Sequence, residues 1–121
     1  MELLIGRVYQ RDEPVRGYRV LVDRLWPRGI RREEAPWDEW WRDLAPSDAL
    51  RRWMHADSEG RWEAFARRYR EELEALPAAV VEKPLAACRR EPVVVLLTAS
   101  RHPERSHVPV LRRWLLERLA E

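Results

Sequence analysis

The chain has 121 residues, the length of one domain, and its 23 basic and 21 acidic side chains leave a net charge of +2. This balance gives no electrostatic argument for nucleic-acid binding, and the single cysteine excludes an intramolecular disulfide and a zinc site built from several cysteines. The N-terminus does not resemble a signal peptide and no apolar run has the length of a membrane span. We therefore expect a soluble, cytoplasmic protein with no membrane partner.

Two apolar stretches near the N-terminus predict strands, from Glu2 to Tyr9 and from Tyr18 to Asp23. The residues between them, Arg11 to Gly17, predict a loop because they contain aspartate, proline and glycine. This loop is too short for the helical crossover that joins parallel neighbours. The two strands are therefore either antiparallel partners or not adjacent.

After Gly29 the spacing of the apolar residues changes to the period of a helix. Trp37, Trp40, Trp41 and Leu44 fall at i, i+3, i+4 and i+7, which predicts one buried face of a helix with Pro36 in its first turn.

Two further helices are predicted behind this segment. Ser47 is a good N-cap for a helix whose apolar face contains Leu50, Trp53 and Met54. The longest helix is expected from about Glu59 to Leu76.

The C-terminal third contains the most apolar strand. Ala78 to Glu82 is ambiguous between a loop and a short strand, and Pro84 is expected to open a short helix that ends at Arg90 and buries Cys88. Val93 to Leu97 is continuously apolar, which is typical of a central strand buried on both faces. The last helix is predicted from about Arg105 to Leu119.

The element order predicts an α/β fold, with residues 1–121 as a single compact domain. Helices lie between and after two widely separated strands, so the Tyr18 and Val93 strands are expected to be parallel neighbours joined by a right-handed crossover. The predicted architecture is a small, mostly parallel sheet flanked by helices.

In open α/β sheets, ligands bind outside the carboxyl ends of the strands. We expect the polar residues that follow the Tyr18 and Val93 strands to meet there, beside the N-terminus of the last helix. His107 is the candidate acid or base, and Asp23 is the carboxylate that orients it. The candidate ligand-binding residues are Arg24, Trp26, Arg28, Ser100, Arg101 and Ser106.

Three functions are compatible with this site. The first is binding or converting a small anionic ligand, phosphate-like or nucleotide-like, with the arginines as anion contacts. The second is nucleic-acid binding through Arg28, Arg31 and Arg32. The acidic residues that follow these arginines weaken this hypothesis. The third is a non-catalytic interaction protein, in which Asp23 pairs with an arginine to hold a tight loop and Trp26 belongs to the core. No metal motif or glycine-rich phosphate loop is present, so no cofactor is assigned, and the oligomeric state stays open.

Five motifs are distributed along the chain: DRLWPRG at positions 23–29, the Trp-rich segment, APS followed by LRRW, the Phe65 and Tyr69 pair, and SHVPVL-x-x-WL. In these motifs the sequence resembles the DUF488 family, in its YeaO-like branch, over nearly the whole chain. It implies a compact α/β domain and assigns no biochemical role.

Two differences from the family pattern concern position 106. Members of this branch usually carry Asn-His-Ala where this chain has Ser106-His107-Val108, so the histidine is kept and the amide is replaced by a hydroxyl. More distant members carry V-D-x-R at a strand end and Cys-His-Arg near the last helix. Val22-Asp23 and His107 are similar to those motifs, but without the cysteine no thiol chemistry is available at position 106.

Overall fold

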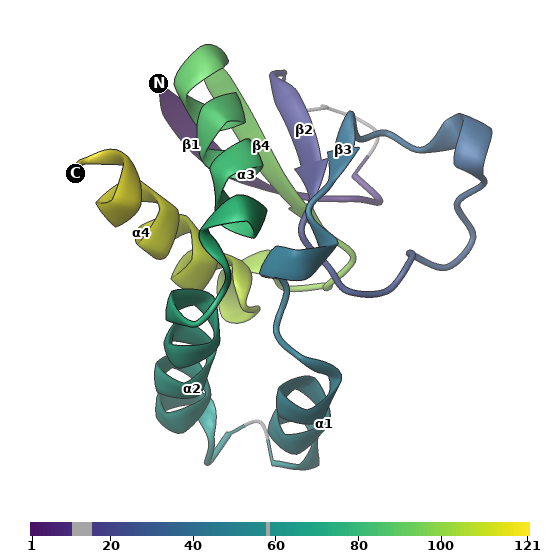
Figure 1. Cartoon of the computed structure of the whole chain (residues 1–121). Helices are drawn as coiled ribbons and strands as arrows, with labels where there is room; N and C mark the ends of the chain where they lie inside the picture. Colours follow the sequence, from purple (N-terminus) through teal and green to yellow (C-terminus); the bar gives the residue numbers. More distant parts are fainter. Residues whose placement is uncertain (11–15, 58) are drawn as a thin grey trace.

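Within the residues that the computed structural model describes, 1–10, 16–57 and 59–121, four strands form one sheet. They are β1 (Glu2–Arg7), β2 (Tyr18–Leu21), β3 (Glu39–Trp40) and β4 (Val93–Thr98), in the order β1-β4-β2-β3 (Figure 1). Every pairing between neighbours is parallel. The predicted α/β class with a small parallel sheet is confirmed.

The strand order answers the question left open by the short first connection. β4 lies between β1 and β2, so the first two strands are not adjacent. β2 and β4 are parallel neighbours, as predicted, with Tyr18 beside Val94 and Leu21 beside Leu97. The predicted loop over residues 11–17 lies outside the described residues up to position 15.

β4 occupies the centre of the sheet because its side chains are buried on both faces. Residues 94–97 are all buried, and successive side chains of a strand point to opposite faces. Val94 and Leu96 belong to the larger of two apolar clusters, whereas Val95 and Leu97 belong to the smaller one. The predicted two-sided burial is confirmed.

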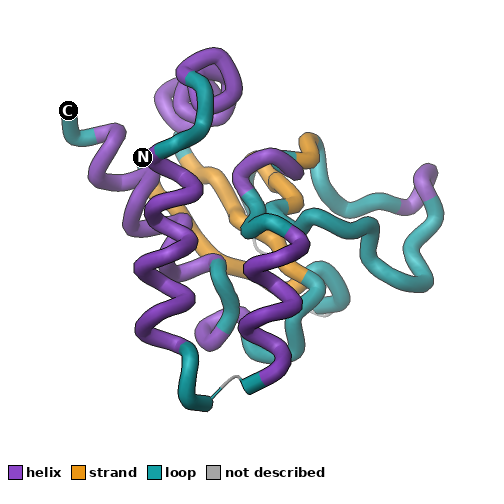
Figure 2. Tube along the Cα trace, turned by 60° about the horizontal axis from the view of Figure 1, so that its bottom comes forward, coloured by secondary structure: helices purple, strands orange, loops and turns teal. Residues whose placement is uncertain are grey.

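Helices supply most of the larger cluster. In the described part of the chain they are α1 (Asp48–Ala56), α2 (Trp62–Glu74), α3 (Ala78–Arg90) and α4 (Val108–Leu119). Figure 1 places α1 and α2 beyond the carboxyl ends of the strands, and Figure 2 shows these two helices side by side. None of the described helices is both long and apolar enough to cross a bilayer.

α1 begins at its predicted N-cap. The Ser47 hydroxyl accepts a hydrogen bond from the backbone N of Leu50 at 3.1 Å. The Glu72 carboxylate on α2 accepts from both the backbone N and the hydroxyl of Ser47, at 2.9 and 2.6 Å, which ties the cap to the neighbouring helix. α2 begins at Trp62, three residues later than predicted, and has the same length as α3.

The predicted helix containing Trp37, Trp40, Trp41 and Leu44 is wrong. This segment forms the short strand β3 and a 3-10 turn, η2 (Arg42–Leu44). Trp41 and Leu44 join the larger cluster, whereas Trp37 and Trp40 join the smaller cluster on the opposite face. Apolar residues with helical spacing are thus divided between two cores, and adjacent tryptophans follow the alternation of a strand.

The predicted helix end at Arg90 is confirmed, but the predictions for residues 78–82 and for Pro84 are wrong. Residues 78–82 are helical, and Pro84 lies inside α3 instead of opening a helix. Val81, Pro84, Leu85 and Cys88 are buried at i, i+3, i+4 and i+7, so one apolar face runs through the proline. Burying this face offsets the single backbone hydrogen bond that a proline removes. The predicted burial of Cys88 is confirmed, and it raises the pKa of the thiol to about 11.

The segment between β2 and β3 covers the face opposite the helices. Trp26 packs edge-on against Trp37 and Trp40, with ring centroids 4.9 and 5.7 Å apart. Gly29 has a φ of 76°, a left-handed conformation that favours glycine. Figure 1 shows this segment extending away from the strands before it returns to β3. Its first residues also form part of the site described next.

Candidate functional site

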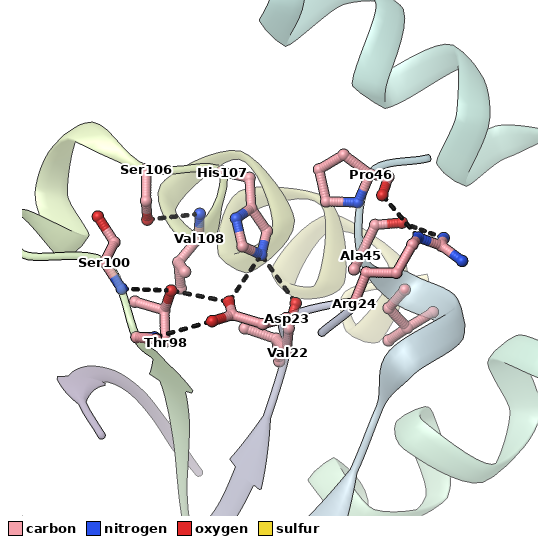
Figure 3. A network of polar contacts seen from close by, with 12 residues as sticks. Val22, Asp23, Arg24, Ala45, Pro46, Thr98, Ser100, Ser106, His107 and Val108 are labelled. Atoms are coloured by element: carbon pink, nitrogen blue, oxygen red, sulfur yellow. Dashed lines mark hydrogen bonds and ion pairs between the residues drawn. The ribbon is translucent and has the colours of Figure 1, made fainter. Parts of the chain in front are cut away.

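The carboxyl ends of β2 and β4 meet the start of α4 (Figure 3). Leu21 and Leu97 are register partners, so the residues after them continue side by side. The backbone N of Val22 donates to the carbonyl of Leu97 at 3.0 Å, which extends the pairing by one residue. Asp23 is thereby brought next to the end of β4.

Asp23 joins the two strand ends through both of its carboxylate oxygens. Thr98 Oγ1 donates to Oδ1 at 2.7 Å, and the backbone N of Ala99 donates to Oδ2 at 2.8 Å. Thr98 Oγ1 also accepts a hydrogen bond from the backbone N of Ser100 at 3.2 Å. Because only 17% of the Asp23 side chain is exposed, these hydrogen bonds fix it between β2 and β4.

His107 reaches the same strand end from the N-cap position of α4. Its Nε2 atom lies 2.8 Å from the carbonyl oxygen of Val22. A carbonyl can only accept, so Nε2 carries the hydrogen and donates, which leaves Nδ1 as the acceptor of the neutral ring. Nε2 also lies 3.7 Å from Asp23 Oδ1, near enough for an electrostatic interaction but too far for a hydrogen bond.

The predicted approach of His107 to Asp23 across more than eighty residues is thus present in the structure. α4 begins at Val108, later than predicted, and follows a 3-10 turn, η3 (Pro103–Arg105). The Ser106 hydroxyl donates to the Pro103 carbonyl at 2.6 Å and accepts from the Val108 backbone N at 3.1 Å. These bonds join the turn to the helix and fix the residue that precedes His107.

Burial lowers the pKa of His107 below its ordinary value of 6.5, while the Asp23 charge and the bond to the Val22 carbonyl oppose this shift. The unfolded chain therefore binds a proton at this residue more readily than the folded chain. We expect stability to be full above pH 6.5 and to fall as the pH drops below it, by at most about 1.4 kcal/mol per pH unit from this group. Urea unfolding between pH 7.5 and 5.5 measures the effect.

Substitution His107→Gln keeps a donor for the Val22 carbonyl and removes the titration, so it should flatten this pH dependence. The double variant His55→Gln/His102→Gln is the control, because both of these histidines are exposed. Equal slopes for wild type and His107→Gln would show that another group is responsible.

A cavity of about 520 Å³ lies over these groups, and we call it the strand-end pocket. Its volume is within the range of roughly 300–1,000 Å³ that is typical of small-molecule sites. Its walls come from the strand ends, the segment after β2, the α1 and α2 helices, and the residues before α4. They are Tyr9, Asp23, Arg24, Leu25, Trp26, Pro27, Arg28, Pro46, Arg51, Met54, His55, Trp62, Phe65, Thr98, Ala99, Ser100, Arg105, Ser106 and His107.

Four arginines line the strand-end pocket, but they differ in how they are held. The Arg24 guanidinium donates to the carbonyls of Pro46 and Ala45 at 2.8 and 2.9 Å. Arg51 lies 3.5 Å from an oxygen of Asp48. The guanidiniums of Arg28 and Arg105 are exposed and have no carboxylate partner within the described ranges. Among the described residues of the lining, Asp23 is the one carboxylate, and the arginines outnumber it.

Five of the six predicted ligand-binding residues line the strand-end pocket, and Arg101 is not among the lining residues. Besides its ring contacts with Trp37 and Trp40, Trp26 donates a hydrogen bond from Nε1 to the Ile30 carbonyl at 2.6 Å. The Ser100 hydroxyl accepts from the backbone N of His102 at 3.3 Å.

Sequence reasoning missed Arg51, Trp62 and Arg105 as lining residues. Arg105 lies two residues before His107, so its proximity to the site had a signal in the sequence. Arg51 and Trp62 belong to α1 and α2, and nothing in their spacing indicates that these helices close over the strand ends.

The chain matches a family model described as the inactive DUF488-N3 subclade over residues 2–121. The uncharacterized protein Rv3073c of Mycobacterium tuberculosis is 43% identical over 111 residues, which cover 92% of this chain and 91% of that protein. The uncharacterized protein YeaO of Escherichia coli is 35% identical over 115 residues, which cover 95% of this chain and 97% of that protein. No solved structure is significantly similar to the chain.

Proposed function

The chain belongs to the DUF488 family, and from this membership and the pocket geometry we propose that it binds a small anionic ligand without converting it. The observation that carries the proposal is the pair of exposed guanidiniums, Arg28 and Arg105, in the lining of the strand-end pocket. In the part of the chain that is described, neither has an acidic partner. Guanidinium groups bind phosphate and carboxylate through paired hydrogen bonds, so an anion would satisfy both.

Two further observations count against catalysis by an Asp23–His107 pair. The Nε2 hydrogen of His107 is directed to the Val22 carbonyl, and both oxygens of Asp23 accept hydrogen bonds from β4 and the residue after it. The 3.7 Å separation leaves no hydrogen bond between these two groups through which Asp23 would orient a general base. The description of the matching subclade as inactive agrees with this arrangement.

The nucleic-acid alternative has weaker support. Arg28, Arg31 and Arg32 are all exposed, but Arg32 shares the short turn η1 (Arg32–Glu34) with two glutamates. These acidic side chains reduce the positive potential that a phosphate backbone would meet.

Calorimetric titration with inorganic phosphate and pyrophosphate at low ionic strength tests the proposal. We expect saturable binding by the wild type and an affinity loss of roughly tenfold or more for Arg28→Ala/Arg105→Ala, since each tenfold corresponds to about 1.4 kcal/mol. The double variant Arg89→Ala/Arg113→Ala is the matched control, because it removes the same charge from exposed positions outside the lining. Equal losses in both double variants would reveal unspecific charge attraction, and no binding by the wild type would reject the proposal.

A further inference from the structure

We infer that the ligand has two parts, a phosphate-like anion and a flat aromatic ring, as in a nucleoside monophosphate. This inference rests on the proposed anion binding and assigns the rest of the strand-end pocket to the ring. Different residues of the lining would hold the two parts of the ligand.

The anion-binding end lies near the carboxyl end of β1. The Tyr9 hydroxyl, just after β1, donates to the carbonyl of Arg28 at 2.9 Å, so the segment after β2 is held beside this edge strand. The turn η3, which contains Arg105, also packs against β1. Arg28 and Arg105 thus reach the lining from two different segments, one bonded to Tyr9 just after β1 and the other packed against β1. Two cations without acidic partners in the described residues form a suitable site for one phosphate group.

Three apolar side chains of the lining come from α1 and α2, which also contribute Arg51 and His55. The Trp62 and Phe65 rings are stacked, with centroids 5.5 Å apart and planes inclined by 23°. Both rings line the strand-end pocket together with Met54 of α1. Trp62 is half-buried and begins α2, so an incoming flat ring can extend an existing stack. Stacking of this kind accepts any base, because every base has a π face.

The volume and the lining together favour a ligand with both parts. Inorganic phosphate alone would leave most of the roughly 520 Å³ unfilled and the aromatic wall without a partner. An uncharged ring alone would leave Arg28 and Arg105 unpaired. A mononucleotide has a flat ring and a phosphate separated by a sugar, and it matches both sets of residues.

Calorimetric titration of the wild-type protein with AMP, adenosine, ribose 5-phosphate and inorganic phosphate tests this inference without any substitution. We expect AMP to bind at least tenfold more tightly than each of the other three compounds. Equal affinities for AMP and ribose 5-phosphate would overturn the ring assignment and leave the proposed anion binding intact. Equal affinities for AMP and adenosine would overturn the assignment of Arg28 and Arg105 to the phosphate. No binding by any phosphate compound would reject both proposals.

A pair of tryptophan variants locates the ring. Trp62→Ala should reduce the affinity for AMP about tenfold and change that for ribose 5-phosphate less than twofold. Trp53→Ala is the control, because Trp53 is a half-buried tryptophan on α1 outside the lining. Unchanged AMP affinity in a folded Trp62→Ala variant would contradict the assignment, and the wild-type comparison above decides the case if that variant does not fold.

Discussion

Replacing Asp23 with alanine is expected to lower the free energy of unfolding by about 3 kcal/mol. The substitution removes two hydrogen bonds to a charged acceptor and leaves the Thr98 hydroxyl and the Ala99 N–H at a junction that is only slightly exposed. It also removes the side-chain hydrogen bonds that join the residue after β2 to the end of β4. Urea unfolding near pH 7.5 measures the change.

Two comparisons make the Asp23 result specific. Asp43→Ala removes an exposed carboxylate from a 3-10 turn and should change stability by no more than about 0.5 kcal/mol. Thr98→Val removes one partner of Asp23, so the double variant Asp23→Ala/Thr98→Val should lose less than the sum of the two single variants. Additive losses would mean that the Asp23 to Thr98 hydrogen bond does not contribute to stability.

Replacing Arg24 with alanine should cost about 2 to 3 kcal/mol of stability, in contrast to Arg28. The Arg24 guanidinium donates to the carbonyls of Ala45 and Pro46, two buried residues that lead into α1. Removing it leaves both carbonyls without this donor and releases the segment after β2 from the start of α1. Denaturant unfolding of both single variants measures the difference.

Arg28→Ala is the matched control, because it deletes an exposed guanidinium from the same DRLWPRG motif. It should leave stability within about 0.5 kcal/mol of the wild type and reduce anion affinity. The reverse pattern, with a stable Arg24→Ala and a destabilised Arg28→Ala, would mean that we have exchanged the supporting arginine and the ligand-binding arginine.

The distinction between these arginines shows what the sequence could and could not predict. The approach of Asp23 to His107 followed from two parallel strands and a helix, because the carboxyl ends of parallel neighbours lie at one edge. Which guanidinium would be held by backbone carbonyls could not be predicted. That depends on where Ala45 and Pro46 pass, and the segment preceding them was expected to be a helix.

Both wrong predictions concern segments in which burial in the folded chain overrides the local sequence pattern. Trp40 and Trp41 face different cores, so their spacing imitates the single face of a helix although the chain is extended. Pro84 was expected to open a helix but lies inside α3. The helix continues through the proline because its apolar face is buried both before and after this position. In both cases tertiary packing decides the structure over the local preference.

The most direct test of ligand binding at the strand ends is a titration of ¹⁵N-labelled protein with AMP, followed by backbone amide and indole resonances. Saturable shifts with one dissociation constant are expected for Arg28, Ala99, Arg105 and the Trp62 indole, which all line the strand-end pocket. The amides of Arg89 and Arg113, outside the lining, should not move. Shifts that grow linearly without saturation, or that occur mainly around Arg89 and Arg113, would contradict a binding site at the carboxyl ends of β2 and β4.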